Sequence, residues 1–108
     1  MEPLPVIFDC LVFDYRLRLI DPIDELAFLA MNCAALGAAW VEDPLIESYT
    51  AGSGDVVPPR LMTFYKCSRA CRWARLACWR LEENDTEKWR RRVDTYLRLA
   101  SRYSAELA

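Results

Sequence analysis

Histidine is absent from this chain of 108 residues. Imidazole is a common general base, a common partner of a nucleophilic Ser or Cys, and a common zinc ligand. Its absence excludes His-dependent acid–base catalysis, Ser-His and Cys-His nucleophile pairs and His metal sites within these residues. Glycine and proline are also scarce, with three and six residues. A collagen-like or a disordered composition is therefore excluded as well.

A long apolar run is missing too. The most apolar stretch, residues 26–41, is interrupted by Asn32 and is shorter than a membrane span. The sequence shows no basic-plus-apolar leader. Its five cysteines are odd in number and form no paired Cys-x-x-Cys modules, so reduced and mostly buried thiols are the simpler interpretation. We expect a cytoplasmic protein with no membrane partner.

Hydrophobic residue types make up 54% of the chain, which is enough for one small domain with a buried core. The charged residues divide into halves of opposite sign. Residues 1–55 hold 2 basic and 10 acidic side chains, whereas residues 56–108 hold 12 basic and 6 acidic ones. The net charge of −2 hides this asymmetry, which could serve an interface within the chain or an outside partner.

The order of elements predicts a mainly α fold in a single domain, residues 1–108. A short N-terminal β-hairpin over residues 1–20 is indicated by β-branched and aromatic residues, with Asp9 near the junction of its strands. A four-helix bundle follows over residues 21–108. Asp21 and the proline after it favour the start of the first helix, which is apolar on nearly every side and belongs in the middle of the bundle. Gly37 is expected to end it.

The second helix is predicted around residues 43–49, before a loop at residues 51–55. The third runs from Pro58-Pro59 to about Glu82. Its core stripe is predicted from steps of three and four residues, and consists of Phe64, Cys67, Cys71, Ala74, Cys78 and Leu81. Thr86 is predicted to cap the fourth helix. The inner face of that helix is predicted to hold Trp89, Val93, Tyr96, Leu97, Ala100, Tyr103 and Leu107.

Asp9 is the first candidate for chemistry. An aspartate at the end of a buried strand can present its oxygens to Mg²⁺ while the strand fixes its direction. From spacing alone, a solvent-facing turn aspartate is the more ordinary interpretation.

The ordered series of segments along the chain resembles the C-terminal lobe of aminoglycoside-phosphotransferase-like kinases. It is most similar to the branch in which that domain is followed by a P-loop ATP-binding domain. The segments that carry the resemblance are Ile7-Phe8-Asp9-Cys10, Arg18, Asp21, Glu25 to Met31, Leu36-Gly37, Tyr49, Ser53-Gly54-Asp55, Phe64-Tyr65-Lys66-Cys67, Arg69-Ala70 and Tyr96 to Ala100. They span nearly the whole chain.

The resemblance implies transfer of the γ-phosphate of ATP to a small-molecule hydroxyl, with Mg²⁺ and ATP as cofactors of the family. Asp9 would be the Mg²⁺-binding aspartate, whose metal bridges the nucleotide phosphates. Asp21 and Glu25 would fasten the start of the following helix to the catalytic loop, and Arg18 could pair with one of them. Helix capping alone also explains Asp21 and Glu25, so their structural role ranks first.

The chain departs from the family in two ways. Val12 stands where the family has an acid, so a second carboxylate from that strand is missing. The resemblance also begins after the family's catalytic loop, so the sequence has no His-x-Asp-Leu base motif and no nucleotide-binding N-lobe. Phosphoryl transfer depends on positioning and on charge around the γ-phosphate. We therefore expect the chain alone to be inactive, to bind neither cofactor tightly, and to have the missing lobe or a second copy as its partner.

The third helix supports a competing hypothesis, a stand-alone helical module that binds a protein partner. Basic and aromatic residues are interleaved opposite the predicted core stripe, and the candidate surface consists of Lys66, Arg69, Arg72, Trp73, Arg75 and Trp79. Such a surface can also bind nucleic acid. A sequence pI near 5.1 and the lack of a nucleic-acid motif argue against that partner. Arginine stems shielding tryptophans within the bundle are the more ordinary interpretation.

Overall fold

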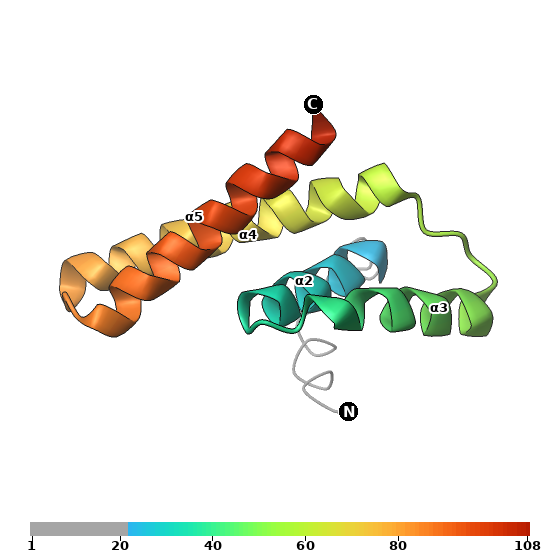
Figure 1. Cartoon of the computed structure of the whole chain (residues 1–108), viewed down its shortest axis with the longest axis horizontal. Helices are drawn as coiled ribbons and strands as arrows, with labels where there is room; N and C mark the ends of the chain where they lie inside the picture. The colour runs from blue at the N-terminus through green and yellow to red at the C-terminus, as the bar shows by residue number, and fades with distance from the viewer. Residues whose placement is uncertain (1–21) are drawn as a thin grey trace, which may run out of the picture.

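The computed structural model describes residues 22–108 (Figure 1). The predicted β-hairpin, with Asp9 and Arg18, lies outside the described residues, and so does Asp21. The described chain is mainly helical and contains four α-helices, as the sequence predicts for this part, and one 3₁₀ turn that the sequence does not predict. The elements are α2 (Pro22–Ala35), η2 (Ala39–Val41), α3 (Glu42–Ser53), α4 (Pro59–Glu83) and α5 (Glu87–Leu107).

Helix α2 begins and ends where the sequence predicts. Pro22 occupies its first position, where a missing N–H costs nothing, and acids follow in the first turn. At the other end Gly37 has a φ of 84°, its N–H donates to the carbonyl of Ala34, and the N–H of Ala38 donates to the carbonyl of Cys33. This is a Schellman motif, which favours glycine at the left-handed position.

Helix α3 extends further than predicted. The expected loop at residues 51–55 is wrong in its first part, because the helix continues through Ser53. Gly54 then ends it with a φ of 79° and an N–H that donates to the carbonyl of Thr50. The Ser53 hydroxyl donates to the carbonyl of Tyr49 at 2.7 Å, which satisfies a carbonyl of the last turn. A Gly-Ser-Gly sequence is therefore compatible with a helix end as well as with a loop.

Helices α4 and α5 form a long antiparallel hairpin, and α2 packs against α4, with α3 beside α2 (Figure 1). The predicted bounds of α4 are confirmed to within one residue. The predicted cap of α5 is confirmed too, because the Thr86 side chain accepts a hydrogen bond from the backbone N–H of Trp89 at 3.4 Å.

The predicted core stripe of α4 is wrong at three of its six positions. Phe64 is 53% exposed, and Cys71 and Cys78 are exposed. Ala74 alone of the predicted stripe is fully buried, and Cys67 and Leu81 are partly buried. The residues of α4 that are buried are Met62, Lys66, Ala70, Ala74 and Ala77.

The reason is the close approach of α4 to its neighbours. A row of alanines lets the α2 and α5 backbones come near, whereas larger side chains would hold them apart. On α5, Leu99 lies on the buried side and Leu97 is 53% exposed. The prediction of Leu97 as an inner residue is therefore wrong.

Two groups of buried side chains form the core. The first joins the start of α2 to α4 and consists of Ile23, Ala27, Ala30, Val57 and Met62. The second joins α2, α4 and α5 and consists of Met31, Ala70, Leu99, Ala100 and Tyr103. Helix α2 contributes to both groups, which agrees with its predicted central place. No helix in residues 22–108 has the length and apolarity that crossing a membrane requires.

We predict opposite effects for alanine at two glycines. Gly37→Ala places a side chain at a φ of 84° and should lower the free energy of unfolding by about 1 kcal/mol. Gly52 lies within α3, and an added Cβ meets nothing within 4 Å, so Gly52→Ala should raise that free energy by about 0.5 kcal/mol. Urea denaturation of both variants checks this, and a Gly37→Ala protein as stable as the parent contradicts it.

Candidate functional site

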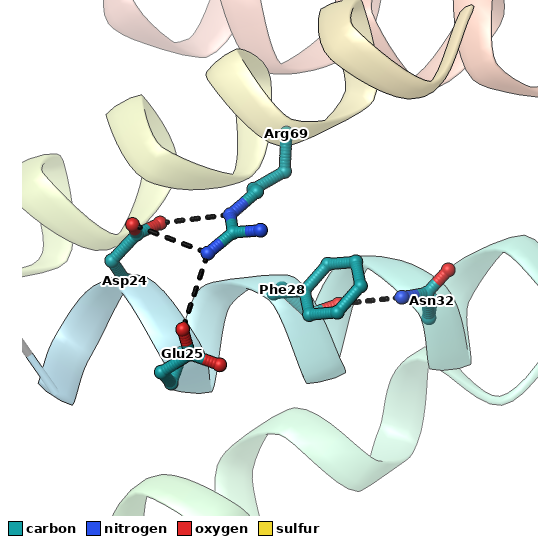
Figure 2. Close-up of polar contacts among 5 residues, drawn as sticks. All are labelled: Asp24, Glu25, Phe28, Asn32 and Arg69. Atoms are coloured by element: carbon teal, nitrogen blue, oxygen red, sulfur yellow. Dashed lines mark hydrogen bonds and ion pairs between the residues drawn. The ribbon is translucent and has the colours of Figure 1, made fainter. Parts of the chain in front are cut away.

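Arg69 joins α4 to the acidic start of α2 (Figure 2). Its Nε donates to Asp24 Oδ1 at 3.0 Å, and its Nη2 donates to Asp24 Oδ2 and to Glu25 Oε2, each at 3.3 Å. The Arg69 side chain is only 14% exposed. A guanidinium binds one carboxylate with two parallel bonds and a second carboxylate with its remaining N–H groups, which a lysine could not do. We call this group of three residues the Arg69 clamp.

The Arg69 clamp also fixes the side of α2 that faces α4. The guanidinium carbon lies 4.5 Å from the centre of the Phe28 ring, one turn beyond Asp24, and therefore makes a cation–π contact as well as ion pairs. The Asn32 amide donates to the carbonyl of Phe28 at 3.2 Å in the next turn (Figure 2). The part of α2 up to Phe28 is thus held to α4 by ion pairs at its start and by the contact of Arg69 with the Phe28 ring further along.

A second ion pair joins α3 to α4. Lys66 Nζ donates to Glu42 Oε1 at 2.7 Å and lies 4.7 Å from the centre of the Tyr103 ring. Lys66 is buried, with 7% of its surface exposed. Its charge is compensated there by the Glu42 carboxylate and by the face of the Tyr103 ring. Burial raises the pKa of Tyr103, and the negative charge of Glu42 raises it further.

Three aromatic rings from three helices form a row beside the Arg69 clamp. Phe28 of α2 and Trp73 of α4 are stacked, with ring centres 6.0 Å apart and planes 6° from parallel. Trp73 also contacts Tyr96 of α5, at 6.3 Å and 33°. Ring pairs at these distances add stabilisation beyond their buried area. The row ties all three helices together at the middle of the molecule.

The structure divides the residues of the candidate interaction surface. Lys66, Arg69 and Trp73 face other helices, where they make the contacts described above. Arg72, Arg75 and Trp79 are on the exposed side of α4, and Arg75 lies 5.0 Å from the centre of the Trp79 ring. Within the bundle, Arg69 lies over the Phe28 ring and Lys66 over the Tyr103 ring, so the basic residues there cover other aromatic rings than the tryptophans that the sequence hypothesis names.

The residues that were expected to support a metal site are described only in part. Glu25 is half-exposed and bonded to Arg69, whereas Asp9, Arg18 and Asp21 lie outside the described residues. In residues 22–108 no three His, Cys, Asp or Glu side chains come close enough to hold a metal ion. Residues 22–108 therefore form no such metal-binding group, and the predicted metal role of Asp9 lies outside them.

The helical cysteines also form no metal site. Cys67 is partly buried, and its Sγ donates to the carbonyl of Ala100 at 3.6 Å. Burial raises the pKa of the Cys67 thiol, and the neighbouring Cys71 raises it further, so Cys67 is a weak nucleophile at neutral pH. Cys71 and Cys78 are exposed, so their expected role in core packing is wrong.

Two residues of these contacts were missed from sequence. Neither Asp24 nor Glu42 is predicted from the sequence to pair with a basic residue of α4. The opposite charges of the two halves of the chain were the available signal, because Asp24 and Glu42 lie in the acidic half and their partners in the basic half. Sequence alone does not show which acid meets which base.

Comparison with known proteins finds uncharacterized proteins of Mycobacterium tuberculosis, strains H37Rv and CDC 1551, and of Mycobacterium bovis. Each is 39% identical to this chain over 83 residues, which is 77% of this chain and 17% of the relative. The chain thus spans about a sixth of the length of these relatives. No known family model matches the chain, and no solved structure matches it.

We predict that the Arg69 clamp stabilises the fold. Arg69→Gln leaves Asp24 with no partner and should lower the free energy of unfolding by about 2 kcal/mol. Arg72→Gln is the matched control, because Arg72 is an exposed arginine on the same helix, and it should change that free energy by less than about 0.5 kcal/mol. Urea denaturation followed by circular dichroism measures both, and equal effects contradict the prediction.

Proposed function

We propose that this chain is the C-lobe part of an ATP-dependent small-molecule phosphotransferase of the aminoglycoside-phosphotransferase-like kind. In the complete catalytic unit it contributes one candidate Mg²⁺ ligand, Asp9, and the helical platform under the acceptor site. The reaction of that unit is transfer of the γ-phosphate of ATP to a hydroxyl group. The likeness of fold does not fix the acceptor. The proposal places the protein in the cytoplasm.

One observation carries the proposal: the segments that resemble the family contact one another in the described structure. Glu25 and Arg69 belong to two of these segments, 44 positions apart, and form an ion pair. Cys67 bonds to Ala100, which joins two more segments. A series of short matches that also packs together as one set supports a shared fold more strongly than the matches alone.

A further pair of contacting segments lies at the end of α3. The Tyr49 hydroxyl donates to Asp55 Oδ2 at 3.0 Å, and the Asp55 backbone N–H donates to the Ser53 hydroxyl at 3.1 Å. Tyr49 and Ser53-Gly54-Asp55 are both part of the resemblance, and Gly54 provides the left-handed residue that this turn requires. The same physical reason, closure of a helix end, accounts for both segments.

The role of the described residues in such an enzyme is positioning. The Arg69 clamp holds the first turn of α2, which directly follows the segment that contains Asp9 in sequence. Phosphoryl transfer depends on the placing of a few charges, so a fixed start of α2 supports the placing of residues before it. No residue of the described part is assigned a catalytic step. The partner of the chain is then the missing lobe, or a second copy where that lobe is absent.

A second candidate, a helical protein-interaction module, is favoured by the exposed part of the Arg/Trp-rich surface. Trp79 is 52% exposed beside Arg72 and Arg75. Further apolar side chains are exposed near the turn between α2 and α3, where Leu36 is 86% exposed and Trp40 is 75% exposed. Exposed aromatic and arginine residues are typical of binding surfaces, and an enzyme that docks a second lobe needs them too.

Reading the coding DNA upstream of Met1 separates the two candidates. The phosphotransferase proposal expects an in-frame segment that encodes a His-x-Asp-Leu motif and an N-lobe before it. A promoter and ribosome-binding site directly before Met1, with no such segment, supports the interaction module and contradicts the proposal.

The metal role of Asp9 gives a prediction for the chain alone. Mn²⁺ should bind weakly, with a Kd of about 0.1 mM or higher, because the second carboxylate of the family is Val12 here. Asp9→Asn should abolish this binding, and the matched control Asp14→Asn should leave it unchanged. Titration followed by electron paramagnetic resonance measures the free Mn²⁺. Submicromolar Mn²⁺ binding, or equal Mn²⁺ binding by the parent and Asp9→Asn, contradicts the prediction. The chain alone is also expected to have no ATPase activity, and activity that survives Asp9→Asn contradicts that expectation.

A further inference from the structure

Two adjoining hollows lie along the α4–α5 hairpin, on either side of the residues that they share. One has a volume of about 280 Å³ and the other, which also reaches α2, about 420 Å³. Both are lined by Trp73, Arg92 and Tyr96. The larger hollow is of the size that small-molecule sites have in proteins, roughly 300–1,000 Å³, and the smaller one lies just below that range.

Aromatic rings form the walls. Trp73 and Tyr96 are partly buried, are packed against each other, and line both hollows. Trp89 adds a third ring in the smaller hollow, and Phe28, stacked on Trp73, adds one in the larger. Rings that are held by packing on three helices lose little conformational entropy when a ligand binds, which suits contact with a planar ligand.

The charge of the lining is positive. Arg92 lines both hollows and Arg91 lines the larger one, and no acidic side chain is among the lining residues of either. Arg92 lies 4.9 Å from the centre of the Trp89 ring, and no carboxylate of residues 22–108 forms an ion pair with it. Arg91 has only an exposed ion pair with Glu87 at 3.6 Å. A guanidinium without a carboxylate partner beside an aromatic wall is suited to a phosphate.

We infer that these hollows bind a small planar aromatic phosphate, of the size and kind of a nucleoside monophosphate. The ring of the ligand packs on the wall made by Trp73 and Tyr96, and its phosphate pairs with Arg92. The inference does not rest on the proposed function, because it uses only residues of α2, α4 and α5 and no metal. Loss of the Asp9-dependent metal binding would leave it unchanged.

Calorimetric titration of the 108-residue protein with AMP tests the inference. AMP should bind with a Kd of about 1 mM or tighter, and adenosine and ribose 5-phosphate should each bind at least about tenfold more weakly, because each lacks one half of the recognised chemistry. Arg92→Gln should weaken AMP binding at least about tenfold. Arg75→Gln is the matched control, because Arg75 also lies 5.0 Å from a tryptophan ring but lines neither hollow, and it should leave the Kd unchanged.

Circular dichroism establishes that both variants fold, which is expected because both arginines are exposed. Absence of AMP binding at 5 mM, a concentration roughly five times the expected Kd, would overturn the inference. Equal binding of AMP and ribose 5-phosphate would overturn it too, and so would equal losses of AMP binding in Arg92→Gln and Arg75→Gln. A short oligoadenylate that binds far more tightly than AMP would also overturn it, in favour of single-stranded nucleic acid.

Discussion

The contact of Arg69 with the first turn of α2 is the interaction on which the rest of the structure depends. Helix α2 begins with two neighbouring carboxylates, Asp24 and Glu25, and a helix N-terminus favours such charges. Packing the same turn against α4 would cover the Asp24 carboxylate without compensation if α4 did not present a guanidinium there. Because Arg69 compensates them and stacks on Phe28, α2 can lie close to α4, and the row of three aromatic rings forms beside it.

The opposite charges of the two halves of the chain thus serve an interface within the molecule. Acids of the first half, Asp24, Glu25 and Glu42, meet Arg69 and Lys66 of the second half. This accounts for the part of the asymmetry that lies inside the bundle. The arginines of α5 extend the positive charge beyond it, along the hollows beside Trp73 and Tyr96.

Local signals predict most helix boundaries, the end of α3 excepted, because each of these boundaries depends on a few neighbouring residues. The left-handed Gly37, the Thr86 cap and the Pro58-Pro59 start of α4 all act within one turn of their own position. The faces of α4 could not be predicted in the same way. That helix packs against two partners, and alanines at positions 70, 74 and 77 decide which side comes closest, which depends on the arrangement of three helices.

In the candidate site, too, the sequence predicts which residues take part better than it predicts which of them contact one another. The sequence indicates that Glu25 and Arg69 matter, but their pairing and the burial of Lys66 depend on the tertiary fold.

A double-mutant cycle on Arg69 and Asp24 tests most directly whether this one arginine holds the start of α2. The account predicts that Arg69→Gln and Asp24→Asn together cost less than the sum of the two single changes, by about 1 kcal/mol or more. Strictly additive losses in the free energy of unfolding would contradict it.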